Sequence, residues 1–144
     1  MHLQKQKSDR EIILAEWQTC VQMADSVSRR RDTTNHLFLT LNLAILATSL
    51  WGLDEYISLV FGFFLCLLWI TFIIDYKNLN KAKFEIICKL EEHLPVTPFK
   101  SEWEKIQKHN QYKELTSLEV FIPSIFAFLY AITLVILLIN EYIL

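Results

Sequence analysis

The side chains able to do chemistry are few and scattered along this chain. Cys20, Cys66 and Cys88 have no metal-binding or redox spacing, and the four histidines are isolated from one another and from the cysteines. Only two glycines occur in 144 residues, which argues against a phosphate-binding loop. We therefore expect three reduced cysteines, no metal, no cofactor and no enzyme activity. A net charge of −2 without a basic aromatic face also argues against nucleic-acid binding.

The most informative side chains are amides next to or inside an apolar segment. Asn35, Asn42 and Ser49 are spaced by seven residues, which places them along one line of a helix. Asn42 lies within the apolar segment, where a carboxamide needs partners and turns toward protein or water. Three interpretations stay open: a hydrogen bond between helices that sets packing, a ring of amides lining an oligomeric pore, and satisfaction by local backbone.

Three apolar runs carry these residues and define the fold class. The chain is 53% hydrophobic, and the runs cover residues 37–53, 57–74 and 120–139. A membrane-spanning helix needs about 20 apolar residues, within a range of about 17 to 25. The sequence therefore predicts three membrane helices, the first two joined as a tight hairpin at residues 54–56. A soluble protein with two core helices is the alternative, but these runs have no polar face.

The basic residues indicate the orientation in the membrane. All 14 Lys and Arg lie before Leu37 or between Tyr76 and Leu118. The positive-inside rule then places the N-terminus and the central segment in the cytoplasm, and the hairpin turn and C-terminus outside. We expect anchors at the membrane interface from a cytoplasmic cluster and from two aromatic residues at the outer end: Arg29, Arg30, Arg31, Trp51 and Tyr56. No cleavable signal peptide is expected, because the first apolar run starts far from Met1.

Small residues on the second run suggest close helix packing. Ser58, Gly62 and Cys66 recur every four residues, which is a pattern that lets helix backbones approach closely. The third span begins at Glu119, and Pro123 falls in its first turns, where proline does least harm.

The polar segments are expected to form a cytoplasmic helical layer. An apolar stripe that includes Trp17 marks a helix before the first span, and the buried stripe after the second span is expected to be Leu79, Ala82, Lys83, Ile86, Ile87 and Leu90. Both helices should continue unbroken into their spans. The pattern Ser101-Glu102-Trp103-Glu104 is a capping box that predicts a short helix through about His109. Trp17 and Trp103 are candidate docking residues for a cytoplasmic partner.

Three blocks of the sequence together resemble a known family. Residues 24–46 contain SRRRDTTNHLFLTLN, residues 74–103 end in LPVTPFKSEW, and residues 112–126 contain TSLEVFIP. They are similar to the RipA-family octameric membrane proteins and to the related SLATT domains of bacterial conflict systems. The residues that match the first pattern are Arg29, Arg30, Asn35 and Asn42, and those that match the second are Pro95, Pro98 and Trp103.

The resemblance implies a homo-oligomer, an octamer, in the bacterial inner membrane. Because SLATT-type proteins are proposed to be effectors of antiphage defence, the resemblance implies that this chain is a membrane-perturbing or pore-forming effector of a defence or stress system. The alternative is a non-conducting membrane scaffold that docks a cytoplasmic partner protein. The expected architecture is all-α, with a cytoplasmic helix over residues 1–35, a membrane hairpin over 36–74, a cytoplasmic segment over 75–118 and a third span over 119–144. Its expected partners are other copies, membrane lipid, and a cytoplasmic protein or signal.

Overall fold

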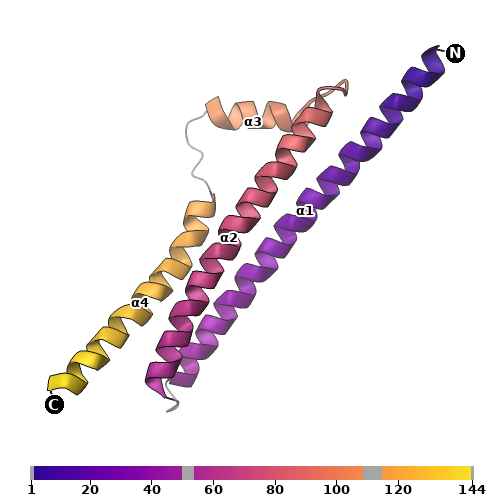
Figure 1. The fold of residues 1–144 in the computed structure, drawn as a ribbon. Coiled ribbons are helices and arrows are strands. Elements are labelled where there is room, and N and C mark those ends of the chain that lie inside the picture. The colour runs from indigo at the N-terminus through magenta and orange to yellow at the C-terminus, as the bar shows by residue number, and fades with distance from the viewer. Residues whose placement is uncertain (1, 50–53, 109–114, 144) are drawn as a thin grey trace. The chain divides into compact units, whose positions relative to one another are not determined.

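The computed structural model describes residues 2–49, 54–108 and 115–143, and every element in these ranges is a helix (Figure 1). The elements are α1 (His2–Ser49), α2 (Glu55–Glu91), α3 (Pro98–Lys108) and α4 (Leu115–Ile143). The expected all-α class is confirmed.

Contacts divide the chain into two compact units. The charged unit comprises Met1–Arg30 and Tyr76–Lys113, and the apolar unit comprises Arg31–Asp75 and Glu114–Leu144. Of the 14 Lys and Arg, Arg31 alone belongs to the apolar unit. The boundary in the structure thus follows the charge pattern of the sequence.

Both long helices run through the points where the composition changes. α1 continues from its polar half past the arginine cluster to Ser49, and α2 continues past Asp75 to Glu91, as the sequence predicts. Proline and glycine, the residues that break helices, do not occur in α1, and Gly62 is the single one in α2. Asp54 caps α2, since its Oδ1 accepts hydrogen bonds from the backbone N–H of Tyr56 (3.1 Å) and Ile57 (3.4 Å).

Two helices are long and apolar enough to cross a membrane, α2 and the part of α4 at Ser117–Ile143. The expectation of three such helices is therefore corrected to two within the described residues. The reason is length and polarity: the apolar end of α1 is described only over residues 37–49 and contains Asn42. That stretch is shorter than the range of about 17 to 25 residues that a span needs.

In the apolar unit the ends of α1, α2 and α4 pack together around two clusters of buried residues. Phe38, Trp69 and Ile73 form one cluster, against which Val120 and Phe126 of α4 pack. Leu59, Cys66 and Tyr130 form the other. On α2 these residues and Gly62 recur at three or four positions, so one face of the helix is buried and the rest is exposed.

In the charged unit the buried face of α2 differs from the expected stripe. Ile87 and Glu91 are fully buried and Lys83 is half-buried, whereas Leu79, Ala82 and Ile86 are exposed. The expected stripe placed Leu79, Ala82 and Ile86 on the buried side. The helix instead keeps the three-and-four spacing of its preceding turns, so the buried positions include polar residues and leave Leu79 and Ile86 outside.

The short helix α3 begins four residues earlier than the capping box predicts, since a cap at Ser101 would make Glu102 the first helical residue. It starts at Pro98, a residue suited to the first helical position because its φ is fixed and it has no N–H to satisfy. Glu91 supplies the cap from α2: its Oε1 accepts the N–H of Phe99 and its Oε2 accepts the N–H of Lys100, both at 3.1 Å. The negative charge also suits the positive end of the helix dipole. Ser101 is therefore inside the helix, where its N–H donates to the carbonyl of Thr97 (3.0 Å).

The start of α4 also differs from the predicted start of the third span. The sequence predicts Pro123 in the first turns of a span that begins at Glu119, whereas α4 begins at Leu115, so Pro123 lies further inside the helix, and its side chain is fully buried. Proline in a helix interior removes one backbone hydrogen bond. Burial against the other helices of the apolar unit offsets part of this cost.

Replacement of Glu91 by alanine tests the cap of α3. We expect Glu91→Ala to destabilise α3 by about 1–2 kcal/mol, because two amide groups lose their acceptor. Hydrogen exchange of the Phe99 and Lys100 amides measures this directly. Glu92→Ala is the matched control, since the neighbouring Glu92 is exposed and pairs with the Lys100 side chain. Equal protection of both amides in Glu91→Ala and the control would contradict the role of Glu91.

Candidate functional site

Asn42 lies at the centre of a polar cluster between the three helices of the apolar unit. Its side chain has no exposed surface. Its Nδ2 donates to the backbone carbonyl of Phe38 (2.8 Å), and its Oδ1 accepts from the thiol of Cys66 on α2 (3.2 Å). The hydroxyl of Tyr130 on α4 donates to the backbone carbonyl of Asn42 (3.3 Å). One residue of α1 thus has hydrogen-bond partners on both other helices.

These bonds combine two of the interpretations that the sequence left open. The amide nitrogen is satisfied by local backbone, and the amide oxygen is satisfied across a helix interface. A buried amide without partners costs several kcal/mol in an apolar medium, so each bond removes a penalty as much as it adds an attraction. In this conformation Asn42 leaves no surface for water or an ion.

Gly62 allows α2 and α4 to approach at the same level. A Cβ built on Gly62 would lie 2.5 Å from Cζ of Tyr130 and 2.8 Å from Cε1 and Cε2 of the same ring. Any side chain at position 62 would therefore displace the ring. Of the other two members of the small-residue pattern, Cys66 is fully buried and Ser58 is half-buried.

A second polar contact lies one to two turns closer to the start of the apolar unit. The indole N–H of Trp69 donates to Oδ1 of Asn35 (2.9 Å). The Trp69 ring stacks on Phe38, with ring centroids 5.8 Å apart and planes inclined by 6°. A Trp side chain buried in apolar surroundings needs an acceptor for its N–H, and Asn35 supplies it.

An ion pair joins α1 to α4. The Nε of Arg31 donates to Oε2 of Glu119 (2.7 Å), and a second guanidinium nitrogen pairs with the same oxygen. The side chains are 16% and 22% exposed, so solvent screens the pair only partly. Sequence reasoning treated Arg31 as an interface anchor and Glu119 as part of a helix start. The signal that sequence reasoning missed was the position of two opposite charges. Glu119 lies at the start of the third apolar run, and Arg31 is the Lys or Arg nearest to the start of the first.

The remaining anchor candidates have other surroundings. Arg29 forms an exposed pair with Asp25 one turn away, and the hydrogen bond from Arg29 lowers the pKa of the Asp25 carboxyl. Arg30 is exposed. The hydroxyl of Tyr56 donates to Glu141 at the far end of α4 (2.7 Å). Trp51 and the side chain of Ser49 lie outside the described residues.

The two tryptophans proposed for docking differ in exposure. Trp17 is half-buried and packs against Phe99 of α3, with ring centroids 5.9 Å apart. Its indole N–H is buried and has no hydrogen-bond partner in the described part of the chain. Trp103 is exposed. The cysteines Cys20, Cys66 and Cys88 are free thiols, and the described residues contain no group of three or more side chains suited to a metal ion.

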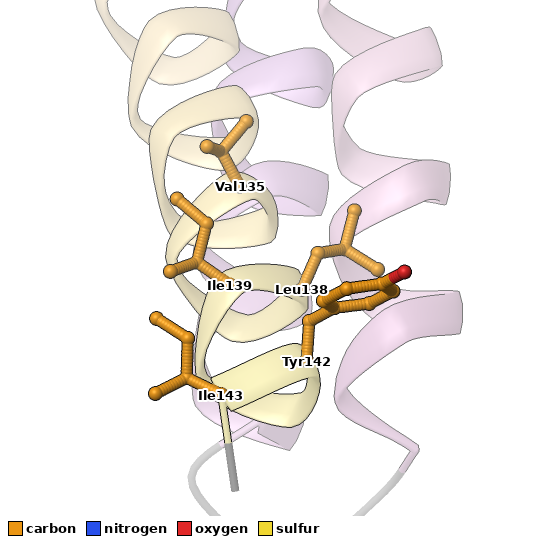
Figure 2. A pocket seen from close by; sticks show the side chains of 5 residues that line it. All are labelled: Val135, Leu138, Ile139, Tyr142 and Ile143. Carbon is orange, nitrogen blue, oxygen red and sulfur yellow. The ribbon is translucent and has the colours of Figure 1, made fainter.

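The end of α4 carries a shallow hollow that is lined by four aliphatic side chains and one tyrosine. Figure 2 shows its lining residues, which all belong to α4: Val135, Leu138, Ile139, Tyr142 and Ile143. A hollow built from one helix face lacks the converging polar groups that orient a small ligand. We read it as part of the apolar outer surface of the apolar unit.

The fold and this site define a helical membrane protein: apolar helices exposed around their outer faces, with polar groups bonded to one another inside. Comparison with family models agrees. Residues 14–139 match the octameric membrane protein family (8xMP), and since the match covers most of the chain, the protein belongs to this family. No curated protein and no solved structure matches the chain.

Substitution at Gly62 tests the close approach of α2 and α4. We expect Gly62→Ala to lower the unfolding free energy in detergent by about 1–3 kcal/mol, because the new methyl overlaps the Tyr130 ring. Ser58→Ala, one turn earlier on the same helix, is the matched control and should change stability little. Combining Gly62→Ala with Tyr130→Leu should recover part of the loss. Wild-type stability of Gly62→Ala would refute the contact.

The ion pair between α1 and α4 gives a second stability prediction. Arg31→Ala leaves the Glu119 carboxylate partly buried without its cation, and we expect a loss of about 1–3 kcal/mol. Arg30→Ala, at the exposed neighbouring position, should cost less than about 0.5 kcal/mol. Thermal unfolding of both variants in the same detergent provides the comparison. Similar losses from the two variants would show that the pairing is not what matters at Arg31.

Proposed function

We propose that this chain is the subunit of a homo-octameric membrane scaffold whose subunits do not conduct ions in the conformation described. The observation that supports this best is the state of the polar groups inside the apolar unit. Asn42, Asn35 and Trp69 bond within the chain, and Arg31 pairs with Glu119. Polar groups that are satisfied in this way set helix packing and leave no polar lining for a water-filled path inside the subunit.

The same packing supports a position for the end of α1 beside the two candidate spans. Phe38 and Asn42 of α1 lie between α2 and α4, the two helices able to cross a membrane. A helix segment that packs between two spans shares their depth in the bilayer. We therefore propose that residues 37–49 of α1 lie within the apolar unit at the depth of these two spans.

The outer surface and the charges support the proposed localisation. Phe61, Phe64 and Phe128 are among the most exposed side chains of the apolar unit, as lipid or neighbouring copies require. The hydroxyls of Thr71 and Thr133 bond to carbonyls of their own helices and so present no unsatisfied group to lipid. With the basic residues gathered in the charged unit, we place that unit in the cytoplasm of a bacterium and the C-terminus outside the inner membrane.

A pore-forming effector of a defence or stress system is the second candidate. The specific observation in its favour is that polar groups follow one another along the interior of the apolar unit, from Arg31 through Asn35 to Asn42. Separation of α1 from its neighbours would expose them. A signal or partner that binds the cytoplasmic layer would then have to supply the free energy of opening.

Membrane potential in bacteria that express the chain tests for an effector that opens without a further signal. A scaffold leaves the signal of a voltage-sensitive dye unchanged, and native mass spectrometry of the purified protein gives an octamer. We expect this result for the wild type. Collapse of the potential would favour the effector and contradict the scaffold.

Asn42→Leu then tests whether Asn42 is involved in any leak. Thr40→Val is the matched control, because Thr40 is exposed on the same helix and its hydroxyl bonds only to the carbonyl of His36. Loss of leakage in Asn42→Leu with the octamer intact would place the amide on the conducting path. Loss of the octamer together with the leak would assign Asn42 to packing alone.

A further inference from the structure

The charged unit carries apolar side chains that its own helices leave uncovered. On α2 these are Leu79 (46% exposed) and Ile86 (50%), with exposed Ala82 between them. The steps of three and four residues from 79 to 82 to 86 are those of a coiled-coil seam, and the alanine permits close approach of another helix. On α1, Ile12 (54% exposed) and Met23 (50%) are uncovered in the same unit.

The short helix α3 occupies a different side of both helices. Its Phe99 packs against Trp17 of α1 and Phe84 of α2. At about 100° per residue, Ile86 lies about 200° around α2 from Phe84, and Met23 lies about 240° around α1 from Trp17. The apolar side chains on the uncovered side therefore face away from α3.

Lipid is an unsuitable occupant for this surface. Lys81, Glu85 and Lys89 are exposed on the same turns of α2 as Leu79 and Ile86. Charged side chains on adjacent faces of one helix are costly inside the hydrocarbon layer. A protein surface is needed that covers the apolar seam and leaves the charges at its rim.

A second copy of this chain fits the requirement. Members of this family assemble as octamers, so copies must adjoin. The surface is also complementary to itself in charge, since Glu16 lies between Ile12 and Met23 on α1, and Lys89 lies beside Ile86 on α2. Among the side chains that the structure describes, at residues 9–48, 54–105 and 117–143, neither Glu16 nor Lys89 forms an ion pair, and both are exposed.

We propose that the uncovered apolar side chains of the charged unit, Ile12 and Met23 on α1 and Leu79 and Ile86 on α2, lie at interfaces with neighbouring subunits. The inference rests on the proposed octamer and adds the location of the contact. The charged unit would then contribute subunit contacts to the octamer, as the membrane helices do.

Photo-crosslinking at single positions tests this proposal. Leu79 and Ile86 are replaced separately by p-benzoylphenylalanine, with Lys81 as the matched exposed control on α2, in cells that make two differently tagged copies. Irradiation should give an adduct of twice the chain mass that carries both tags from positions 79 and 86 and not from 81. An adduct to lipid or to another protein would overturn the assignment.

Native mass spectrometry makes the test independent of the proposed octamer. An octamer that yields no doubly tagged adduct from positions 79 and 86 would refute the interface while the proposed assembly stands. A wild-type protein that is monomeric would refute the proposed assembly itself. As a second variant, Ile86→Glu should lose the octamer peak, and Lys81→Glu should retain it. An intact octamer in Ile86→Glu would also count against the interface.

Discussion

The apolar unit depends on satisfying polar groups where water is scarce. Asn42 shows the constraint most clearly, because its amide is fully buried and its partners come from its own helix and from α2, while its backbone carbonyl is bonded by α4. In hydrocarbon the association of helices gains little from the hydrophobic effect. Specific contacts then decide which faces meet. The amide and the Gly62 contact both involve Tyr130 and fix one level of the three helices, and the Arg31–Glu119 pair fixes a second.

These contacts constrain both possible functions. A scaffold needs subunits whose helices keep one arrangement, and bonded interior groups provide it. An effector needs a second arrangement in which the same groups meet water. The free-energy difference between the two arrangements then includes the loss of each of these bonds, about 0.5–1.5 kcal/mol for a typical one. Several such bonds together favour the closed arrangement unless a partner binds the open one better.

The sequence predicts the long helices well because the signals there are repeated many times. Apolar runs, the absence of breakers and the charge pattern indicate α1, α2 and α4 and their continuity. It fails where one contact from a distant segment decides the outcome. The start of α3 follows from Glu91 and Pro98 and not from the local capping box, and the buried face of α2 follows its helical register and not the apolar residues Leu79 and Ile86. The ion pair of Arg31 could be found only by matching opposite charges at the entries of two runs.

The cap on α3 makes the order of this short helix conditional. Its first free amides are accepted by a carboxylate that belongs to the last turn of α2, and the link of six residues between α2 and α3 contains Pro95. An eleven-residue helix is marginal alone, since nucleation is costly. We therefore expect α3 to be fully ordered only together with the last turn of α2. Conversely, unwinding of that turn of α2 releases α3, which makes Glu91 a coupling point between local melting and the loss of the Phe99 contacts with Trp17 and Phe84.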